Sequence, residues 1–243
     1  MSNDKTLLYG ALGYIMNARY QSLLAILLVG FVPSISIIFG INIIDDEFSS
    51  QIFFLLCKLW IFIIPTLWYL RVENNSISKV YPSKEGLKMG FLTGVGMSII
   101  ILITWLLFED SLDTVQMIST LKSKGLSNIN LYILGMLYWI LINSLLEEYV
   151  FRWFITTKSS VLFGSDTIAI VFSASLFTLH HTLALHYFGF IWWQTILASF
   201  GLLSAAAIWS WLYIRYRSIW VCWLSHAICD VVVFSIGYQI LFT

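Results

Sequence analysis

The chain contains seven runs of mainly apolar residues, each about 20 residues long, separated by short polar clusters. A helix of about 20 residues crosses the hydrocarbon core of a bilayer. Only 11% of the residues are charged, whereas roughly 25% is usual in soluble domains. The sequence therefore predicts an all-α fold, a polytopic transmembrane helical bundle that forms one integral-membrane domain over residues 1–243. The predicted spans are residues 20–44, 51–70, 89–108, 130–157, 166–185, 189–214 and 218–242.

The basic residues alternate between loops and predict the orientation. Basic residues lie at the N-terminus and then at every second loop, whereas the intervening loops are acidic or neutral. Under the positive-inside rule, seven spans place the N-terminus in the cytoplasm. Residues 6–17 are a candidate interfacial helix or eighth span, and an eighth span would put the N-terminus outside. The basic positions are Lys5, Arg19, Arg71, Lys79, Lys84, Lys88, Lys158, Arg215 and Arg217; the acidic clusters are 45–47 and 109–113.

Charge and cysteine content exclude several other classes of protein. The 13 basic and 13 acidic residues balance, so net charge gives no indication of nucleic-acid binding. The cysteines are Cys57, Cys222 and Cys229, an odd number without a CxxC pair, which indicates neither a disulfide framework nor a thiolate zinc site. The low proline content and compact loops favour a multi-pass protein of a bacterial cell membrane. The sequence leaves the oligomeric state open.

The fourth span contains three charged residues within "NSLLEEYVFRWF". A charge at the centre of a bilayer costs on the order of 3 kcal/mol, so each one requires a partner or a function. Glu148 and Arg152 are four residues apart on one helix face, and we expect them to form a buried ion pair. Glu147 points about 100° away from Glu148 and shares a face with Asn143 instead. Glu147 is therefore the candidate acid or base.

Two later spans also contain polar residues at helical spacing. His180 and His181 are neighbours in the fifth span, so we expect them to face different sides, and His181 is the candidate site residue. His226 and Asp230 are four residues apart in the last span, where a carboxylate can orient an imidazole or both can hold one metal. We expect an intramembrane polar cavity where the three spans meet. Lys58, in the second span, is interpreted as a residue that extends its charge to the interface or pairs within the bundle.

These residues form three ordered motifs. Glu147-Glu148-x-x-x-Arg152 resembles the EExxxR motif of the CPBP family, the CAAX-protease and bacteriocin-processing (Abi) family. Phe177-x-x-x-His181 resembles its FxxxH motif, and His226-x-x-x-Asp230 resembles a third motif with Asn or a similar polar residue at the last position. The motifs lie within residues 143–230. The resemblance implies an intramembrane endopeptidase acting on a membrane-associated peptide or protein. Asp230 departs from the Asn of prenyl-protein proteases, which weakens the transfer of CAAX specificity.

Peptide hydrolysis requires an activated water, a stabilised oxyanion and a proton for the leaving amine. With the resemblance as a guide, we assign Glu147 as general base, with His181 holding the same water. His226, oriented by Asp230, would stabilise the oxyanion, and Arg152 would hold Glu148. This mechanism needs no cofactor. The alternative is a zinc ion on Glu147, His181 and His226, which would leave one position for water.

Two non-proteolytic functions compete with this interpretation. The first is a bacteriocin immunity or scaffold protein that keeps the fold without activity, and the intact motifs argue against it. The second is a proton-coupled transporter, which predicts inverted repeats and interrupted helices; no repeat is visible in the sequence.

The protease interpretation also requires the candidate residues to lie at similar depths in the membrane. Glu147 is predicted to lie about 15 Å from an inner helix end near Lys158, and His181 about 20 Å from a helix start near Asp166. The predicted depths of the two residues in the membrane therefore differ.

Overall fold

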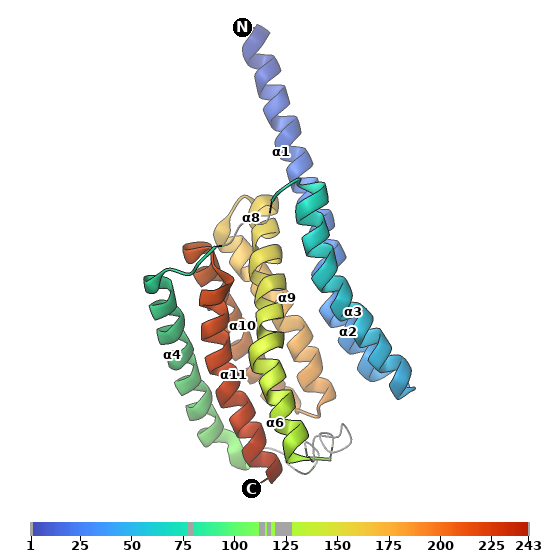
Figure 1. Cartoon of the computed structure of the whole chain (residues 1–243), viewed down its shortest axis with the longest axis vertical. Coiled ribbons are helices and arrows are strands. Elements are labelled where there is room, and N and C mark those ends of the chain that lie inside the picture. The colour runs from blue at the N-terminus through green and yellow to red at the C-terminus, as the bar shows by residue number, and fades with distance from the viewer. Residues whose placement is uncertain (1, 77–79, 112–114, 116–117, 120–127, 243) are drawn as a thin grey trace.

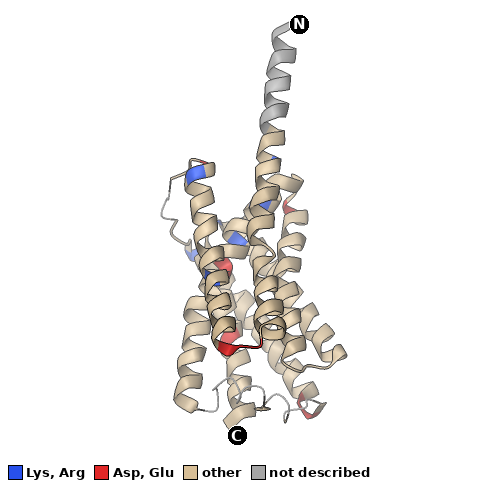
Figure 2. Ribbon diagram, turned by 90° about the vertical axis from the view of Figure 1, so that its right-hand side faces the viewer, with Lys and Arg blue, Asp and Glu red and all other residues tan. Residues whose placement is uncertain are grey.

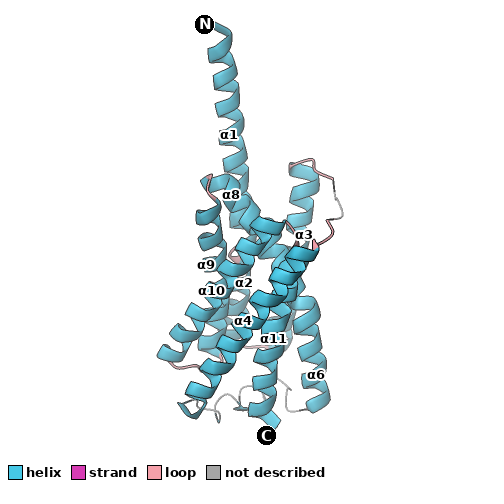
Figure 3. Cartoon of the chain, turned by 90° about the vertical axis from the view of Figure 1, so that its left-hand side faces the viewer, coloured by secondary structure: helices cyan, strands magenta, loops and turns pink. Residues whose placement is uncertain are grey.

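The computed structural model describes residues 2–242 except 77–79, 112–114, 116–117 and 120–127, and for residues 2–14 it describes only the backbone. These residues form helices and connecting loops, with no strand among them (Figures 1 and 3). Seven helical stretches are long and apolar enough to cross a membrane, which confirms the predicted multi-pass all-α fold. The stretches are Ile15–Ile43, Glu47–Val72, Lys84–Ser111, Ile129–Phe163, Asp166–Tyr187, Trp192–Tyr216 and Ile219–Phe242.

The first span belongs to a long N-terminal helix that projects beyond the bundle (Figure 1). Helix α1 runs without a break over Ser2–Val29, and α2 (Val32–Ile37) and the π-helical η1 (Ile38–Ile43) complete the span. Residues 6–17 are therefore the beginning of α1, and they form neither a separate interfacial helix nor an additional span. The two termini lie at opposite ends of the molecule, as an odd number of spans requires (Figure 1).

Polar residues cap four of the spans, three of which begin earlier than the sequence predicted. The first N–H groups of a helix lack partners within the helix, and a side-chain oxygen of the preceding residue can accept from them. Such caps start α3 (Glu47–Leu67), α4 (Lys84–Phe108), α6 (Ile129–Tyr138) and α9 (Asp166–Tyr187). Helix α3 continues as η2 (Trp68–Val72), and α4 as the 3₁₀ turn η3 (Glu109–Ser111). The capping residues are Asp46, Ser83, Asn128 and Ser165.

The fourth span is one continuous helical rod with two π-helical segments. After α6 come η4 (Trp139–Asn143), α7 (Ser144–Glu147), η5 (Glu148–Thr156) and α8 (Thr157–Phe163). The rod passes the predicted end at residue 157 and stops at Gly164, whose φ of 66° favours glycine. Short π-helical segments are frequent at functional sites, and these two flank Glu147.

The remaining spans pack as two close pairs. Helix α4 runs parallel to α11 (Ile219–Phe242), and α9 runs antiparallel to α10 (Trp192–Tyr216). Two glycines permit the first contact, because a Cβ added at Gly90 would lie 2.5 Å from the Val221 carbonyl oxygen, and one at Gly94 would lie 2.9 Å from that of Ser225. The buried core includes Phe151, from the fourth span.

Charged residues are distributed unequally along the bundle. The Lys and Arg residues visible in Figure 2 lie in the half of the bundle nearer the N-terminus, whereas acidic residues occur in both halves, including the opposite end. This distribution agrees with the basic loops of the sequence, and a cytoplasmic N-terminus stays a prediction. Lys79 and Asp113 lie outside the described residues, and the side chain of Lys5 lies outside the described part of α1. Cys57, Cys222 and Cys229 are free thiols, as expected from the sequence.

Candidate active site

The candidate site residues come from three spans that meet inside the bundle. Glu147 is the last residue of α7, and Glu148 and Arg152 lie in η5. His181 lies in α9 and His226 in α11. Asp230, also in α11, lies one helical turn after His226. All six predicted residues therefore belong to one region, although the contacts among them differ from those expected.

Helix length explains how Glu147 and His181 reach the same depth. The fourth span ends at Phe163 and α9 begins at Asp166, so the two helices form a tight antiparallel hairpin. Glu147 lies about 24 Å from this turn and His181 about 22 Å, at 1.5 Å per residue. The predicted mismatch in depth disappears because the fourth span continues past Lys158 to Phe163.

The expected buried ion pair is present. Nε of Arg152 donates to Oε2 of Glu148 at 3.0 Å, and both side chains are completely buried. The Arg152 guanidinium carbon also lies 4.7 Å from the centroid of the Phe177 ring, a cation–π contact. A buried ion pair needs additional hydrogen bonds to offset its desolvation. Glu148 makes one such bond, to a second helix.

His226 is the second partner of Glu148. Nδ1 of His226 lies 2.9 Å from Oε1 of Glu148. An ionised carboxylate only accepts, so Nδ1 carries the proton and donates. The imidazole also stacks on Trp209, with ring centroids 4.0 Å apart and planes 19° from parallel. These contacts hold the ring from two sides.

Asp230 is a more distant neighbour of His226 than the sequence suggested. Its Oδ1 lies 3.6 Å from Nε2 of His226, beyond a hydrogen bond, whereas Glu148 is bonded to Nδ1. Oε2 of Glu147 lies 3.8 Å from the same Nε2. The expectation that Asp230 orients His226 is therefore replaced: Glu148 orients the ring, and Asp230 faces the reactive side of the site. The i,i+4 rule identified Asp230 but could not include a partner on another helix.

Glu147 has the separate environment that the helix wheel predicted. Its Oε1 accepts from Nδ2 of Asn143 at 2.8 Å, and Arg152 forms its ion pair with Glu148. The Glu147 side chain is 20% exposed, while that of Glu148 is fully buried. The Glu148 carboxylate is thus buried in the core, whereas the Glu147 carboxylate is accessible and faces two helices that contain histidines.

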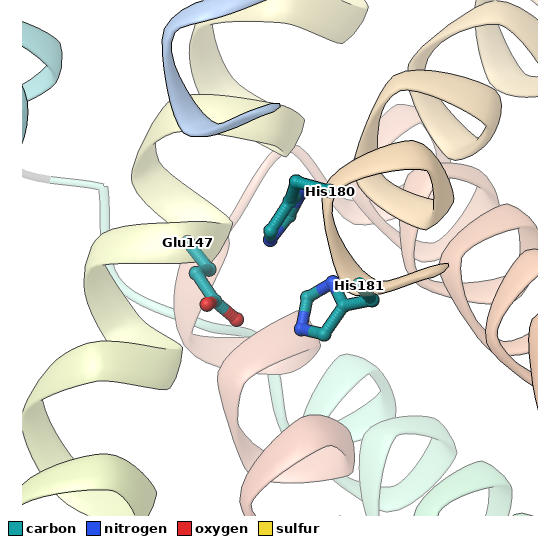
Figure 4. A group of neighbouring side chains, drawn as sticks. All are labelled: Glu147, His180 and His181. Carbon is teal, nitrogen blue, oxygen red and sulfur yellow. The ribbon is translucent and has the colours of Figure 1, made fainter. Parts of the chain in front are cut away.

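Both neighbouring histidines face Glu147, contrary to the expectation for His180. Figure 4 shows the rings of His180 and His181 turned toward the carboxylate, and their centroids are 4.0 Å apart. Successive helix residues point about 100° apart around the helix axis. Two long side chains that lie on either side of the direction of Glu147 can nevertheless both reach toward it. Nδ1 of His181 donates to the Phe177 carbonyl at 3.0 Å, which leaves its Nε2 free to hold a water.

The same three side chains could hold a metal ion. One ligand atom from each of Glu147, His180 and His181 lies within 4.8 Å of the others. Nδ1 of His180 is buried without a hydrogen-bond partner in the described structure. Two imidazoles and a carboxylate are a common zinc donor set, so the residues fit the ion. This set differs from the one expected, because it contains His180 where the sequence suggested His226.

Sequence reasoning gave too little weight to two residues of the site. His181 was preferred to His180 on the expectation that the two face different sides of the helix, but both rings face Glu147. Lys58 was predicted to extend to the interface or to pair within the bundle, and it does pair: its Nζ donates to Oδ1 of Asn143, the residue that contacts Glu147. The sequence contained two features that could have indicated this contact: an asparagine four residues before the candidate base, and an unpaired cation in another span.

Comparison with known proteins identifies one family. Residues 129–232 match the family model described as "Type II CAAX prenyl endopeptidase Rce1-like", a region that begins with α6 and includes all three motifs. The described helical elements from α1 to η3 lie outside the match. No curated protein and no solved structure gave a significant match to the chain.

Proposed function

We propose a glutamate-based mechanism for this chain, whose residues 129–232 belong to the Rce1-like type II CAAX prenyl endopeptidase family and indicate a protease. The helices that contain the candidate residues are long and apolar enough to span a membrane. The chain is therefore interpreted as an intramembrane endopeptidase. Its substrate is a membrane-associated peptide or protein, and its location is a bacterial cell membrane with the N-terminus in the cytoplasm.

In the proposed reaction, Glu147 takes a proton from a water held beside Nε2 of His181. The water oxygen attacks the peptide carbonyl, and the C–N bond breaks as Glu147 returns the proton to the leaving amine. The products are a carboxylic acid and an amine, so water is the only co-reactant. One observation carries this assignment: Glu147 is the accessible acid of the doublet and lies against His181, while its neighbour is paired with arginine.

His226 is proposed to stabilise the oxyanion as an imidazolium, because Nδ1 already donates to Glu148 and Nε2 must carry a second proton to donate. Glu148 holds the opposite nitrogen at 2.9 Å, so the direction of Nε2 is set before substrate arrives. Asp230 lies on the side of Nε2. An ionised Asp cannot donate to an oxyanion; the charge of Asp230, 3.6 Å from Nε2, is instead proposed to favour the imidazolium form of His226, whose orientation Glu148 sets. Arg152 acts through Glu148 as a positioning residue.

Comparative peptidomics of cells that carry wild type or Glu147→Gln tests the proposal. The glutamine variant keeps the size and can still accept from Asn143, but it cannot remove a proton. We expect at least one membrane-derived peptide to disappear in Glu147→Gln cells. An unchanged peptide population, with both proteins present at equal levels, would instead favour the non-enzymatic immunity or scaffold function.

The second candidate is a zinc-dependent form of the same protease, which the cluster of Glu147, His180 and His181 favours. A bound zinc ion would supply Lewis-acid activation of water. In that form, the two histidines and the carboxylate serve as ligands, and His226 keeps its place on Glu148. Inactivation by a chelator and recovery with zinc would select this form.

A further inference from the structure

Lys58 is a cation in the middle of α3, a helix with few buried residues. An ammonium group at this depth is costly unless it has polar partners. Among the described residues, no carboxylate forms an ion pair with Lys58. Its Nζ instead donates to Oδ1 of Asn143 and lies 3.3 Å from the hydroxyl of Tyr138. Both partners belong to the fourth span, which contains the candidate base.

The bond from Lys58 determines which way the Asn143 amide faces. An ammonium group only donates, so the amide oxygen must be directed to Lys58. The amide nitrogen is then directed to Glu147, where Nδ2 donates to Oε1 at 2.8 Å. If the amide were reversed, Nζ and Nδ2 would be two donors facing each other. Lys58 thus fixes a donor toward one oxygen of Glu147, and the other oxygen faces His226.

We propose that Lys58 is a positioning residue for Glu147 that acts through Asn143. The inference rests on the proposed function and deepens it by adding a residue from outside the matched family region, which begins at residue 129. Through the amide, Lys58 holds one oxygen of Glu147 so that the other stays directed toward His226, which fixes the orientation of the candidate base. The same bonds join α3 to the fourth span.

Carbodiimide labelling tests this coupling without needing a substrate. Dicyclohexylcarbodiimide is an apolar reagent that modifies protonated carboxyl groups, and peptide mapping by mass spectrometry locates the product. In purified full-length protein at neutral pH, we expect Lys58→Met to raise the labelling rate of Glu147 about tenfold, because the carboxyl group loses roughly one hydrogen bond that holds it in place. Lys58→Arg, which keeps a donor and a charge, should label close to the wild-type rate.

The matched control lies on the same helix. Oγ1 of Thr66 is 2.6 Å from the Tyr149 hydroxyl, a bond that also joins α3 to the fourth span but does not contact Glu147. Thr66→Val should leave the labelling of Glu147 unchanged. If it raises labelling as much as Lys58→Met does, the effect is loosened packing of α3 and the inference is wrong.

A double-mutant cycle tests the route through the amide. Asn143→Leu alone should raise labelling, and adding Lys58→Met should change it by less than about twofold, because the connection is already cut. Effects that multiply would show that Lys58 acts independently and would overturn the proposed route. Equal labelling of Glu147 in Lys58→Met and wild type would overturn the inference altogether.

Kinetics separate this inference from the proposed function. With a peptide whose cleavage depends on Glu147, Lys58→Met should lower kcat about 10- to 100-fold with little change in KM. If labelling behaves as expected but no Glu147-dependent cleavage exists, the proposed function fails and the coupling stands. If cleavage exists and Lys58→Met retains wild-type kcat, the inference fails and the proposed function stands.

Discussion

Nδ1 of His226 lies 2.9 Å from Oε1 of Glu148, so the second acid of the doublet holds the histidine of the last span. The other oxygen of Glu148 accepts from Arg152 at 3.0 Å. A single buried carboxylate therefore makes two bonds, one within the fourth span and one that connects this span to α11. This relationship makes Glu148 the structural centre of the site, and it leaves Glu147 and Asp230 on the accessible side.

Glu148→Gln should destabilise the protein strongly. The substitution leaves the buried Arg152 charge without its counter-ion, and breaking a buried pair in this way costs about 3–5 kcal/mol in soluble proteins. We expect a large fall in the thermal unfolding temperature in detergent micelles, together with loss of proteolysis. Glu147→Gln serves as the control, because that partly exposed carboxylate should affect activity without comparable loss of stability.

Asp230→Asn should be tolerated far better than Glu148→Gln. Because Glu148 rather than Asp230 is bonded to His226, the imidazole keeps its orientation in this variant. We expect kcat/KM to stay within about tenfold of wild type, less than the loss of a general acid–base residue produces. A loss as large as that of Glu147→Gln would show that Asp230 takes a direct part in proton transfer.

His180→Phe distinguishes the two forms of the proposed chemistry. If zinc is required, removal of one ligand of the Glu147–His180–His181 group should abolish both zinc retention and activity. If the mechanism is metal-free, the phenylalanine ring should replace the imidazole that stacks on Phe151, and activity should survive. Metal content measured by elemental analysis on the same purified samples provides a readout independent of cleavage.

Gly90→Ala should loosen the packing of α4 against α11. The added methyl group would meet the backbone carbonyl of Val221 at 2.5 Å, so the two helices must separate. Gly96→Ala, on the same helix, has no atom within 4 Å of the new Cβ and gains helix propensity. Thermal unfolding in detergent should show a lower transition temperature for Gly90→Ala and an equal or higher one for Gly96→Ala.

Much of the architecture followed from the order of the residues alone. Apolar runs long enough for a bilayer gave the number of spans, because the lipid imposes a helix on any such segment. The i,i+4 spacing predicted the Glu148–Arg152 pair, and the helix wheel placed Asn143 beside Glu147. These predictions depend only on geometry within one helix, which varies little from protein to protein.

Contacts between helices depended on the tertiary structure. The extension of the fourth span to Phe163 set the depth at which Glu147 meets α9, and only then could His180 and His181 converge on it. The assignment of His226 to Glu148 required the relative rotation of α11 and η5, which no spacing within either helix encodes. The sequence by itself determined which polar residues lie within the membrane, because their positions inside long apolar runs can be read directly from it. The folded bundle decided which of them are partners, because that depends on how the helices rotate and pack against one another.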